Sequence, residues 1–124
     1  MIRVIINADD LWKDHETNLA IEEAFGTRCI TSSTIMANSS TWDDVHRIVN
    51  DNPDGSFGIH LNLSEGPALT TNEVLFANGI VDRDNIFTGK ARMLNVLDKG
   101  LEEAIYNEWD TQISTIINKE LINA

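Results

Sequence analysis

The chain has 124 residues, with 9 lysine and arginine residues against 20 aspartate and glutamate residues, and its formal net charge is -11. This length predicts a single domain over residues 1–124, since a chain of this size buries about two thirds of its unfolded surface. The negative charge repels phosphate backbones and anionic membranes, so we expect neither nucleic acid nor a membrane as a partner. Cys29 is the only cysteine, which excludes an intrachain disulfide and a thiolate metal cluster. This cysteine usage fits a reducing, cytoplasmic location, and no segment approaches the length that a bilayer span needs.

The first predicted element is a short strand in residues 2–6, where the β-branched residues 4–6 form an apolar run. An unbroken apolar run is typical of a strand that is covered on both faces. Asn7, Asp9 and Asp10 then fall at its carboxyl end, the edge of a parallel sheet beyond which ligands bind. Two adjacent carboxylates repel each other unless a cation or a shared proton compensates. The pair is either a metal ligand beside a general base or a solvated turn, and this stretch alone leaves both open.

A helix and a second strand are predicted next. Asp14 stands at the N-cap position of a helix that is expected to end at Gly26. Residues 29–36 are rich in Ile, Thr and Ser and predict a strand that ends near Asn38. Cys29 would open this strand as a small buried hydrophobic residue.

A second helix and a third strand follow the same alternation. Thr41, with Asp44 three residues later, matches the spacing of a capping box ahead of apolar positions at helical intervals. Residues 52–55 have turn chemistry and lead into a strand over residues 56–63. In that strand the apolar face would hold Phe57, Ile59, Leu61 and Leu63, and the other face Gly58, His60 and Asn62.

The remainder predicts a long loop and one long helix. Residues 64–89 show no sustained period, with a short hairpin expected at 80–87. From Leu101 onward, apolar positions recur at a helical period and form a packing stripe. The polar face of this helix would hold Glu102, Glu103, Asn107, Glu108 and Asp110.

The alternation of strands and helices predicts an α/β fold with a parallel sheet, whose strand ends gather polar residues on one side. Aspartate with histidine is an ordinary ligand set for a divalent cation, although a catalytic site needs about three protein ligands. His60 is either such a ligand or a hydrogen-bonded interior histidine. His15 is expected to be solvated rather than a further ligand, and His46 to lie on a helix surface. The residues that converge are Asp9, Asp10, Asn38, His60 and Asn62.

Several segments in order resemble the YdjC-like carbohydrate deacetylases, a family that includes the chitooligosaccharide deacetylases. The resemblance covers nearly the whole chain, and its motifs are specific when taken together. They are Asn-Ala-Asp-Asp at 7–10, Asn18 with Ala20-Ile21, Thr31-Ser32-Ser33-Thr34 running to Met36 and Asn38, Gly58-Ile59-His60-Leu61-Asn62-Leu63 with Gly66-Pro67, and Val81-Asp82-Arg83-Asp84 running to Phe87.

The resemblance implies an irregular (β/α) barrel that removes an acetyl group from oligosaccharides containing N-acetylglucosamine. It implies a divalent metal cofactor, magnesium or zinc, for which Asp10 and His60 match the ligands. Asp9 matches the carboxylate that acts as general base, and we expect Asn38 and Asn62 to bind substrate. In this chemistry the metal polarises the acetyl carbonyl while the base takes a proton from water.

Two departures from the family pattern affect these expectations. The family motif usually continues from the paired aspartates with Phe-Gly, where this chain has Leu11-Trp12, which changes the loop over the site. The third metal histidine and the acid-base histidine of the family lie in motifs beyond the point where this chain stops. We therefore expect the chain to correspond to the amino-terminal part of a longer enzyme.

Two other functions compete with a deacetylase. A non-catalytic carbohydrate- or metal-binding protein would keep the sugar groove without a full metal shell. A phosphoacceptor receiver domain has similar length and alternation, but it needs an aspartate at the end of the third strand, where this chain has His60. An open sheet edge also favours self-association, either beside the third strand or through the helix at 101–121.

Overall fold

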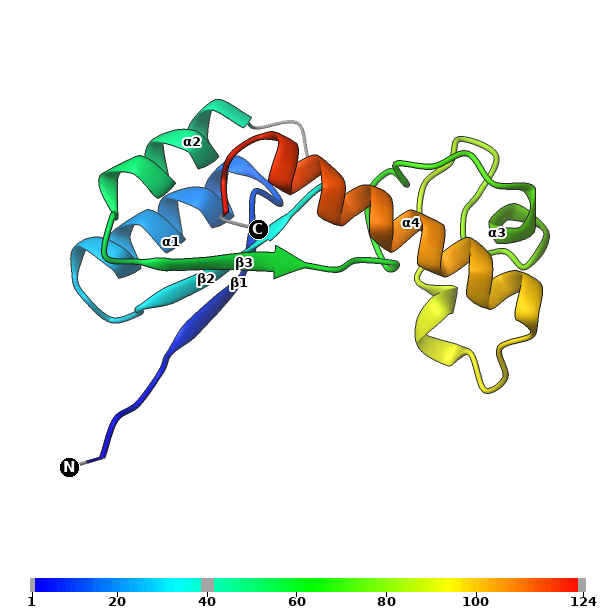
Figure 1. Ribbon diagram of the computed structural model, residues 1–124, viewed down its shortest axis with the longest axis horizontal. Coiled ribbons are helices and arrows are strands. Elements are labelled where there is room, and N and C mark those ends of the chain that lie inside the picture. Colours follow the sequence, from blue (N-terminus) through cyan, green and yellow to red (C-terminus); the bar gives the residue numbers. More distant parts are fainter. Residues whose placement is uncertain (1, 39–41, 123–124) are drawn as a thin grey trace. The chain divides into compact units, whose positions relative to one another are not determined.

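The computed structural model describes residues 2–38 and 42–122, and it alternates strands and helices before a helical remainder (Figure 1). The chain forms two compact units, which we call the sheet unit (Met1–His60 with Thr115–Ala124) and the loop unit (Leu61–Ser114). No helix within the described ranges is both long and apolar enough to cross a membrane. In chain order the elements are β1 (Asn7–Leu11), α1 (His15–Gly26), β2 (Ser32–Met36), α2 (Trp42–Asp51), β3 (Ser56–His60), α3 (Glu73–Ala77), the 3-10 helix η1 (Lys90–Met93) and α4 (Lys99–Asn118).

The sheet unit contains a parallel sheet with the strand order β1-β2-β3, as the alternation predicts. Figure 1 shows α1 and α2 together on one face of this sheet. Ile35, Val45 and Ile48 are fully buried there, and the rings of Phe25 and Phe57 lie 5.3 Å apart between centroids. The described sheet is open at both edges, so an irregular barrel stays a prediction.

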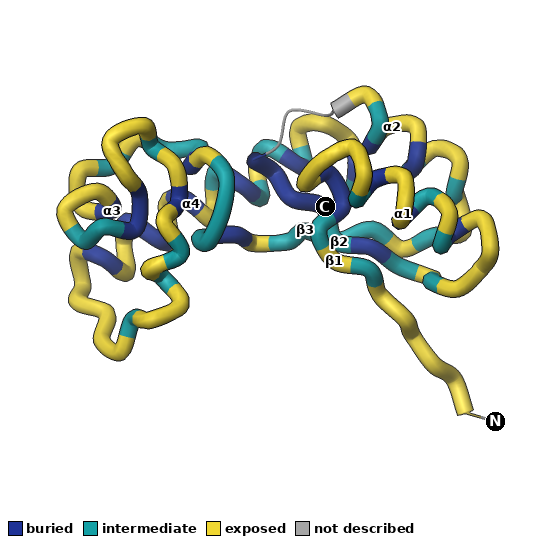
Figure 2. Tube along the Cα trace, turned by 180° about the vertical axis from the view of Figure 1, so that it is seen from behind, coloured by how far each residue is buried: buried dark blue, intermediate teal, exposed yellow. Residues whose placement is uncertain are grey.

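The first strand starts later than the apolar run suggests. Pairing between β1 and β2 begins at Asn7 opposite Ser32. Ile2 and Ile5, in the run that precedes it, are 91% and 81% exposed (Figure 2). The expectation that this run is covered on both faces is wrong for the described residues, because the run precedes β1 and contacts the sheet through the Ile6 carbonyl, which accepts from Thr31 N.

α1 begins at the N-cap that the sequence predicts, whereas the residue predicted to open β2 is not buried. The Asp14 side chain accepts from Thr17 N at 2.8 Å, and α1 ends at Gly26 as expected. The predicted cap at Thr41 lies outside the described residues. Cys29 is exposed rather than buried, because β2 begins only at Ser32 and the Cys29 amide closes the end of α1 by donating to the Ala24 carbonyl.

The loop unit has its own apolar core. The hairpin expected at 80–87 is present as an antiparallel bridge between Val81 and Phe87, whereas α3 was not predicted. The long predicted helix is observed as α4. The buried cluster consists of Ala68, Leu75, Ile80, Val81, Phe87, Leu101, Ala104 and Ile105.

One position on α4 contradicts the predicted polar face. Glu108 is fully buried, while the neighbouring Trp109, which the apolar stripe includes, is 36% exposed. The buried carboxylate is tolerated because it accepts hydrogen bonds from Leu69 and Thr70 of the preceding loop. Glu108 thus fastens that loop to α4 inside the loop unit.

Candidate functional site

A β-bulge in β1 presents the two adjacent aspartates. Ala8 pairs with Ser33, and Leu11 pairs with Ile35. Between these two pairs β1 therefore contains one residue more than β2, which is the definition of a bulge. Asp10 takes a left-handed backbone conformation at this irregularity, with φ of 67°. In a regular strand, adjacent side chains point to opposite faces. The bulge removes that constraint on Asp9 and Asp10.

Both carboxylates lie near the imidazole of His60, the last residue of β3. Its Nδ1 atom is 3.4 Å from Asp10 Oδ1 and 4.0 Å from Asp9 Oδ1. The Asp10 and His60 side chains are about one third exposed, at 34% and 30%, whereas that of Asp9 is 65% exposed. The structure therefore brings two residues of β1 together with one residue of β3, and the roles of all three stay predictions.

Two neutral side chains hold one oxygen of Asp9. Thr34 Oγ1, on β2, donates to Asp9 Oδ1 at 2.8 Å and lies 3.3 Å from His60 Nδ1. Asn7 Nδ2 donates to the same Asp9 oxygen at 2.8 Å. The parallel register places Thr34 opposite Gly58, two residues before His60, so Thr34 stands between the aspartates and the imidazole. Sequence reasoning saw Asn7 and Thr34 as parts of motifs but did not assign them these contacts.

The departure at Leu11-Trp12 forms a buried support immediately after the site. Both residues are fully buried, and Trp12 has a positive φ of 84°. The Trp12 amide donates to the side-chain oxygen of the buried Asn18 on α1 at 2.7 Å. The chain leaving the paired aspartates is thus fastened to α1.

The two asparagines expected to bind substrate have different surroundings. Asn38 is 5% exposed and lies two residues after the end of β2 in the sheet unit. Asn62 belongs to the loop unit, where its side chain accepts from Ser64 N and donates to the Glu65 carbonyl. A contact of either with substrate stays a prediction.

The other two histidines stand apart from this cluster. His46 is exposed on α2, as expected. His15 Nδ1 lies 3.0 Å from Asp44 Oδ2, and this hydrogen bond lowers the pKa of the Asp44 carboxyl below its ordinary value. Arg47 Nη2 also lies 3.8 Å from Asp44 Oδ1 and offsets the charge of that carboxylate. The second imidazole-carboxylate pair is therefore less favourable for a cation than the pair with two aspartates.

The geometry of Asp10 and His60 fits two ligands of one cation. Ligand atoms about 2.1 Å from a tetrahedral cation lie about 3.4 Å from each other. The distance between Asp10 Oδ1 and His60 Nδ1 is 3.4 Å. Lys13 Nζ is 3.9 Å from the other Asp10 oxygen and offsets part of the Asp10 charge, so Asp9 supplies the additional negative charge beside the imidazole. Within the described ranges, however, no group of three His, Cys, Asp or Glu side chains is arranged to hold a metal ion.

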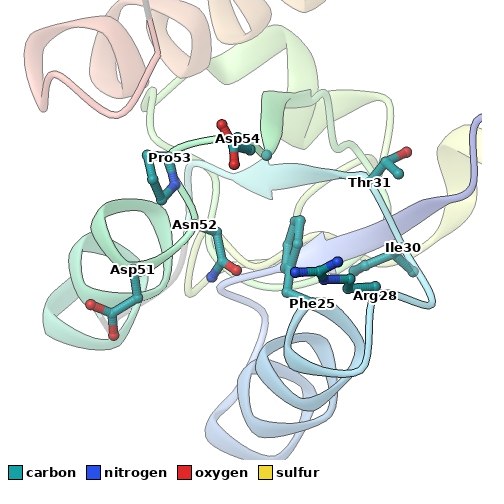
Figure 3. Close-up of a pocket in the computed structure, with 9 residues that line it drawn as sticks. Phe25, Arg28, Ile30, Thr31, Asp51, Asn52, Pro53 and Asp54 are labelled. Atoms are coloured by element: carbon teal, nitrogen blue, oxygen red, sulfur yellow. The ribbon is translucent and has the colours of Figure 1, made fainter.

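A separate hollow lies at the opposite ends of the strands. It has a volume of about 400 Å³ and is formed by the segments that precede β2 and β3 (Figure 3). Figure 3 shows Arg28 beside Phe25, with Asp51 at the end of α2 and Asp54 on the turn that follows it. This hollow and the Asp10 cluster are therefore different regions of the sheet unit.

Comparison with known proteins identifies the family of this chain and relatives that are named carbohydrate deacetylases. A family model described as YdjC-like protein matches residues 3–121. The carbohydrate deacetylase of Listeria monocytogenes serotype 4a is 30% identical over 121 residues, covering 97% of this chain and 46% of that protein. The carbohydrate deacetylase of Halalkalibacterium halodurans is 27% identical over 113 residues, covering 90% of this chain and 46% of that protein.

The fold also matches a solved structure. A putative cellobiose-phosphate cleavage protein from Enterococcus faecalis V583 superposes with a TM-score of 0.77 at 25% identity. The match covers 94% of this chain and 44% of that protein. The chain thus spans less than half the length of the relatives described here.

Proposed function

Because the chain belongs to the YdjC-like protein family, we propose that it carries part of the active site of a metal-dependent carbohydrate deacetylase. The substrate we propose is an N-acetylated amino-sugar oligosaccharide such as a chitooligosaccharide. The observation that supports this proposal is the position of Asp10 and His60, with 3.4 Å between Oδ1 and Nδ1 and Asp9 alongside.

In this proposal the two neighbouring aspartates have different tasks. Asp10 and His60 would hold the divalent cation, magnesium or zinc, because their donor atoms have the spacing of two ligands of one ion. When bound, such a cation polarises the acetyl carbonyl and lowers the pKa of an attacking water. Asp9 takes the proton of that water as general base, since its carboxylate is the more exposed of the two. A cation here would also compensate the repulsion between the adjacent carboxylates.

A second candidate function rests on the size of the donor set. A catalytic site of this kind needs about three protein ligands, and the described residues bring two together. A carbohydrate- or metal-binding protein that does not turn over its ligand would have such an incomplete set. The two candidates differ in whether acetate is released.

The test is acetate release from N,N′-diacetylchitobiose, measured with added magnesium or zinc and again after chelation. A deacetylase releases acetate only with metal, and Asp10→Asn abolishes release because it removes an anionic ligand. Asp43→Asn, an exposed aspartate on α2, is the matched control and leaves release unchanged.

Three results would decide against the proposal in different ways. Release that persists after chelation, or in Asp10→Asn, contradicts the metal-dependent mechanism. Binding of sugar or metal by calorimetry without any release favours the binding protein. Cleavage of a phosphorylated disaccharide in parallel assays, with no acetate formed, favours the activity for which the Enterococcus faecalis protein is named.

A further inference from the structure

We infer that Asn7 and Thr34 are positioning residues that aim the carboxylate of Asp9, an inference that rests on the proposed role of Asp9 as general base. Neither residue needs to touch substrate or metal for this role. Their contribution is to hold one carboxylate oxygen so that the other is presented in a fixed direction.

The hydrogen bonds of Asp9 are all on one of its oxygens. Oδ1 accepts from Asn7 Nδ2 and from Thr34 Oγ1, each at 2.8 Å. Within the described residues, no side chain or amide donates to Oδ2. Two donors from different strands fix the plane of a carboxylate that is 65% exposed and would otherwise exchange between rotamers. The oxygen left without a donor is the one available to accept a proton from water.

Neutral donors suit a base better than a cation does. An ion pair with lysine or arginine would place a cation against the Asp9 carboxylate, whereas an amide and a hydroxyl orient it without adding a charge. Asp10 shows the contrast, because the amine of Lys13 lies 3.9 Å from its Oδ2, while both aspartates lie within 4.0 Å of His60 Nδ1. The surroundings of the two aspartates thus differ in a way that matches a base beside a ligand.

Thr34 also links the base to the proposed ligand. Its hydroxyl carries one proton, which is directed to Asp9 Oδ1, and the same oxygen lies 3.3 Å from His60 Nδ1, where the direction of any hydrogen bond depends on the tautomer of the ring. The position of Thr34 is set by the parallel register, which pairs it with Gly58. One side chain on the central strand thus touches both the base and the histidine.

The experiment measures the rotamer of Asp9 directly by three-bond NMR couplings about χ1 in the 124-residue chain. Thr34→Val keeps the shape of the side chain and removes the hydroxyl, and Thr34→Ser keeps the hydroxyl. We expect one fixed rotamer for Asp9 in the wild-type chain and in Thr34→Ser, and averaged couplings in Thr34→Val. Asp10 is the internal control, and its couplings stay the same in all three proteins.

A second variant keeps the test independent of any folding defect in Thr34→Val. Asn7→Ala removes the other donor at an exposed position, and it should also increase averaging at Asp9. Averaged couplings of Asp9 in the wild-type chain would overturn the inference, and so would fixed couplings in both Thr34→Val and Asn7→Ala.

Acetate release supplies the kinetic readout and separates the two proposals. Thr34→Val lowers kcat about 10- to 100-fold with little change in KM, the range expected for losing a hydrogen bond to a charged group, and Thr34→Ser restores kcat. Equal loss in Thr34→Ser and Thr34→Val would contradict the role of the hydroxyl. If wild-type protein releases no acetate while the couplings behave as expected, the deacetylase proposal fails and the orientation of Asp9 stands.

Discussion

The buried carboxylate of Glu108 gives the sharpest prediction about stability. Glu108 is fully buried on α4, and its two oxygens accept four hydrogen bonds. Oε1 accepts from Leu69 N at 3.0 Å and from Gln112 Nε2 at 2.8 Å. Oε2 accepts from Thr70 N at 2.8 Å and from Thr70 Oγ1 at 2.6 Å. The perturbation is Glu108→Gln, which preserves the shape of the side chain and replaces one acceptor with a donor.

The expected loss of stability depends on the orientation of the new side-chain amide. With its NH2 group toward Thr70, the Thr70 hydroxyl can rotate and accept, but the Thr70 amide loses its acceptor. With its NH2 group toward Leu69, the Leu69 amide and Gln112 Nε2 both lose their acceptor. A buried donor without a partner costs about 1–3 kcal/mol, so we expect the variant to lose about 2–3 kcal/mol of unfolding free energy. Glu108→Ala leaves all four donors without this acceptor and lowers the unfolding free energy by about 4 kcal/mol or more.

Urea denaturation followed by circular dichroism measures this loss, and hydrogen exchange at the Leu69 and Thr70 amides locates it. Glu103→Gln, an exposed glutamate on the same helix, is the matched control and changes the free energy by less than about 0.5 kcal/mol. If Glu108→Gln is as stable as that control and both amides keep their protection, the carboxylate does not fasten the loop and the reasoning is refuted.

Two further predictions concern α1 and the turn after it. Asp14→Ala removes the acceptor for the Thr17 amide and destabilises α1, which a lowered helical signal and earlier unfolding would show, whereas Glu16→Ala is the milder control. The same hydrogen bond lowers the pKa of Asp14 below its ordinary value of 3.8. The stabilisation by this cap is therefore present above pH 3.8 and is lost as the pH falls through the lowered pKa. A cap contribution that persists in strong acid would contradict this assignment. Cys29 is exposed, and a thiol reagent should therefore label one site per chain without denaturant, while labelling that requires urea would show that the residue is buried after all.

The order of the elements in the sheet unit follows from local sequence signals. The Asp14 cap and the terminal Gly26 delimit α1, and the alternation in β3 places His60 on its polar face. These signals depend only on neighbouring residues, and the parallel arrangement follows from the alternation of strands and helices. The open edge of β1 could not be predicted in the same way, because burial of residues 2–6 depends on what lies beside them.

The details of the site depend on pairing between strands, which the sequence does not display. The extra residue in β1 lies between Ala8 and Leu11 and is defined only by the register against β2. That bulge lets Asp9 and Asp10 approach the same imidazole and places Thr34 beside them. A strand with regular alternation would have separated the two carboxylates, so their joint approach to His60 could not be derived from their adjacency.

In the loop unit, too, the helix itself could be predicted from neighbouring residues, whereas the burial of one side chain could not. A helical period correctly predicted α4 but assigned Glu108 to its polar face. The carboxylate is buried because donors from Leu69 and Thr70 meet it, and those residues lie far away in the sequence. Partners of this kind leave no period in the helix itself.

The most direct test of the central claim is a zinc titration of the chain followed by the imidazole NMR signals of its three histidines. We expect the His60 signals to change first, because two carboxylates face that ring and Lys13 offsets only one of them, whereas His15 faces the single Asp44 carboxylate that Arg47 offsets. In Asp10→Asn the His60 response should move to the zinc concentration at which the exposed His46 responds. If His60 in the wild-type chain responds no earlier than His46, Asp10 and His60 do not bind a common cation.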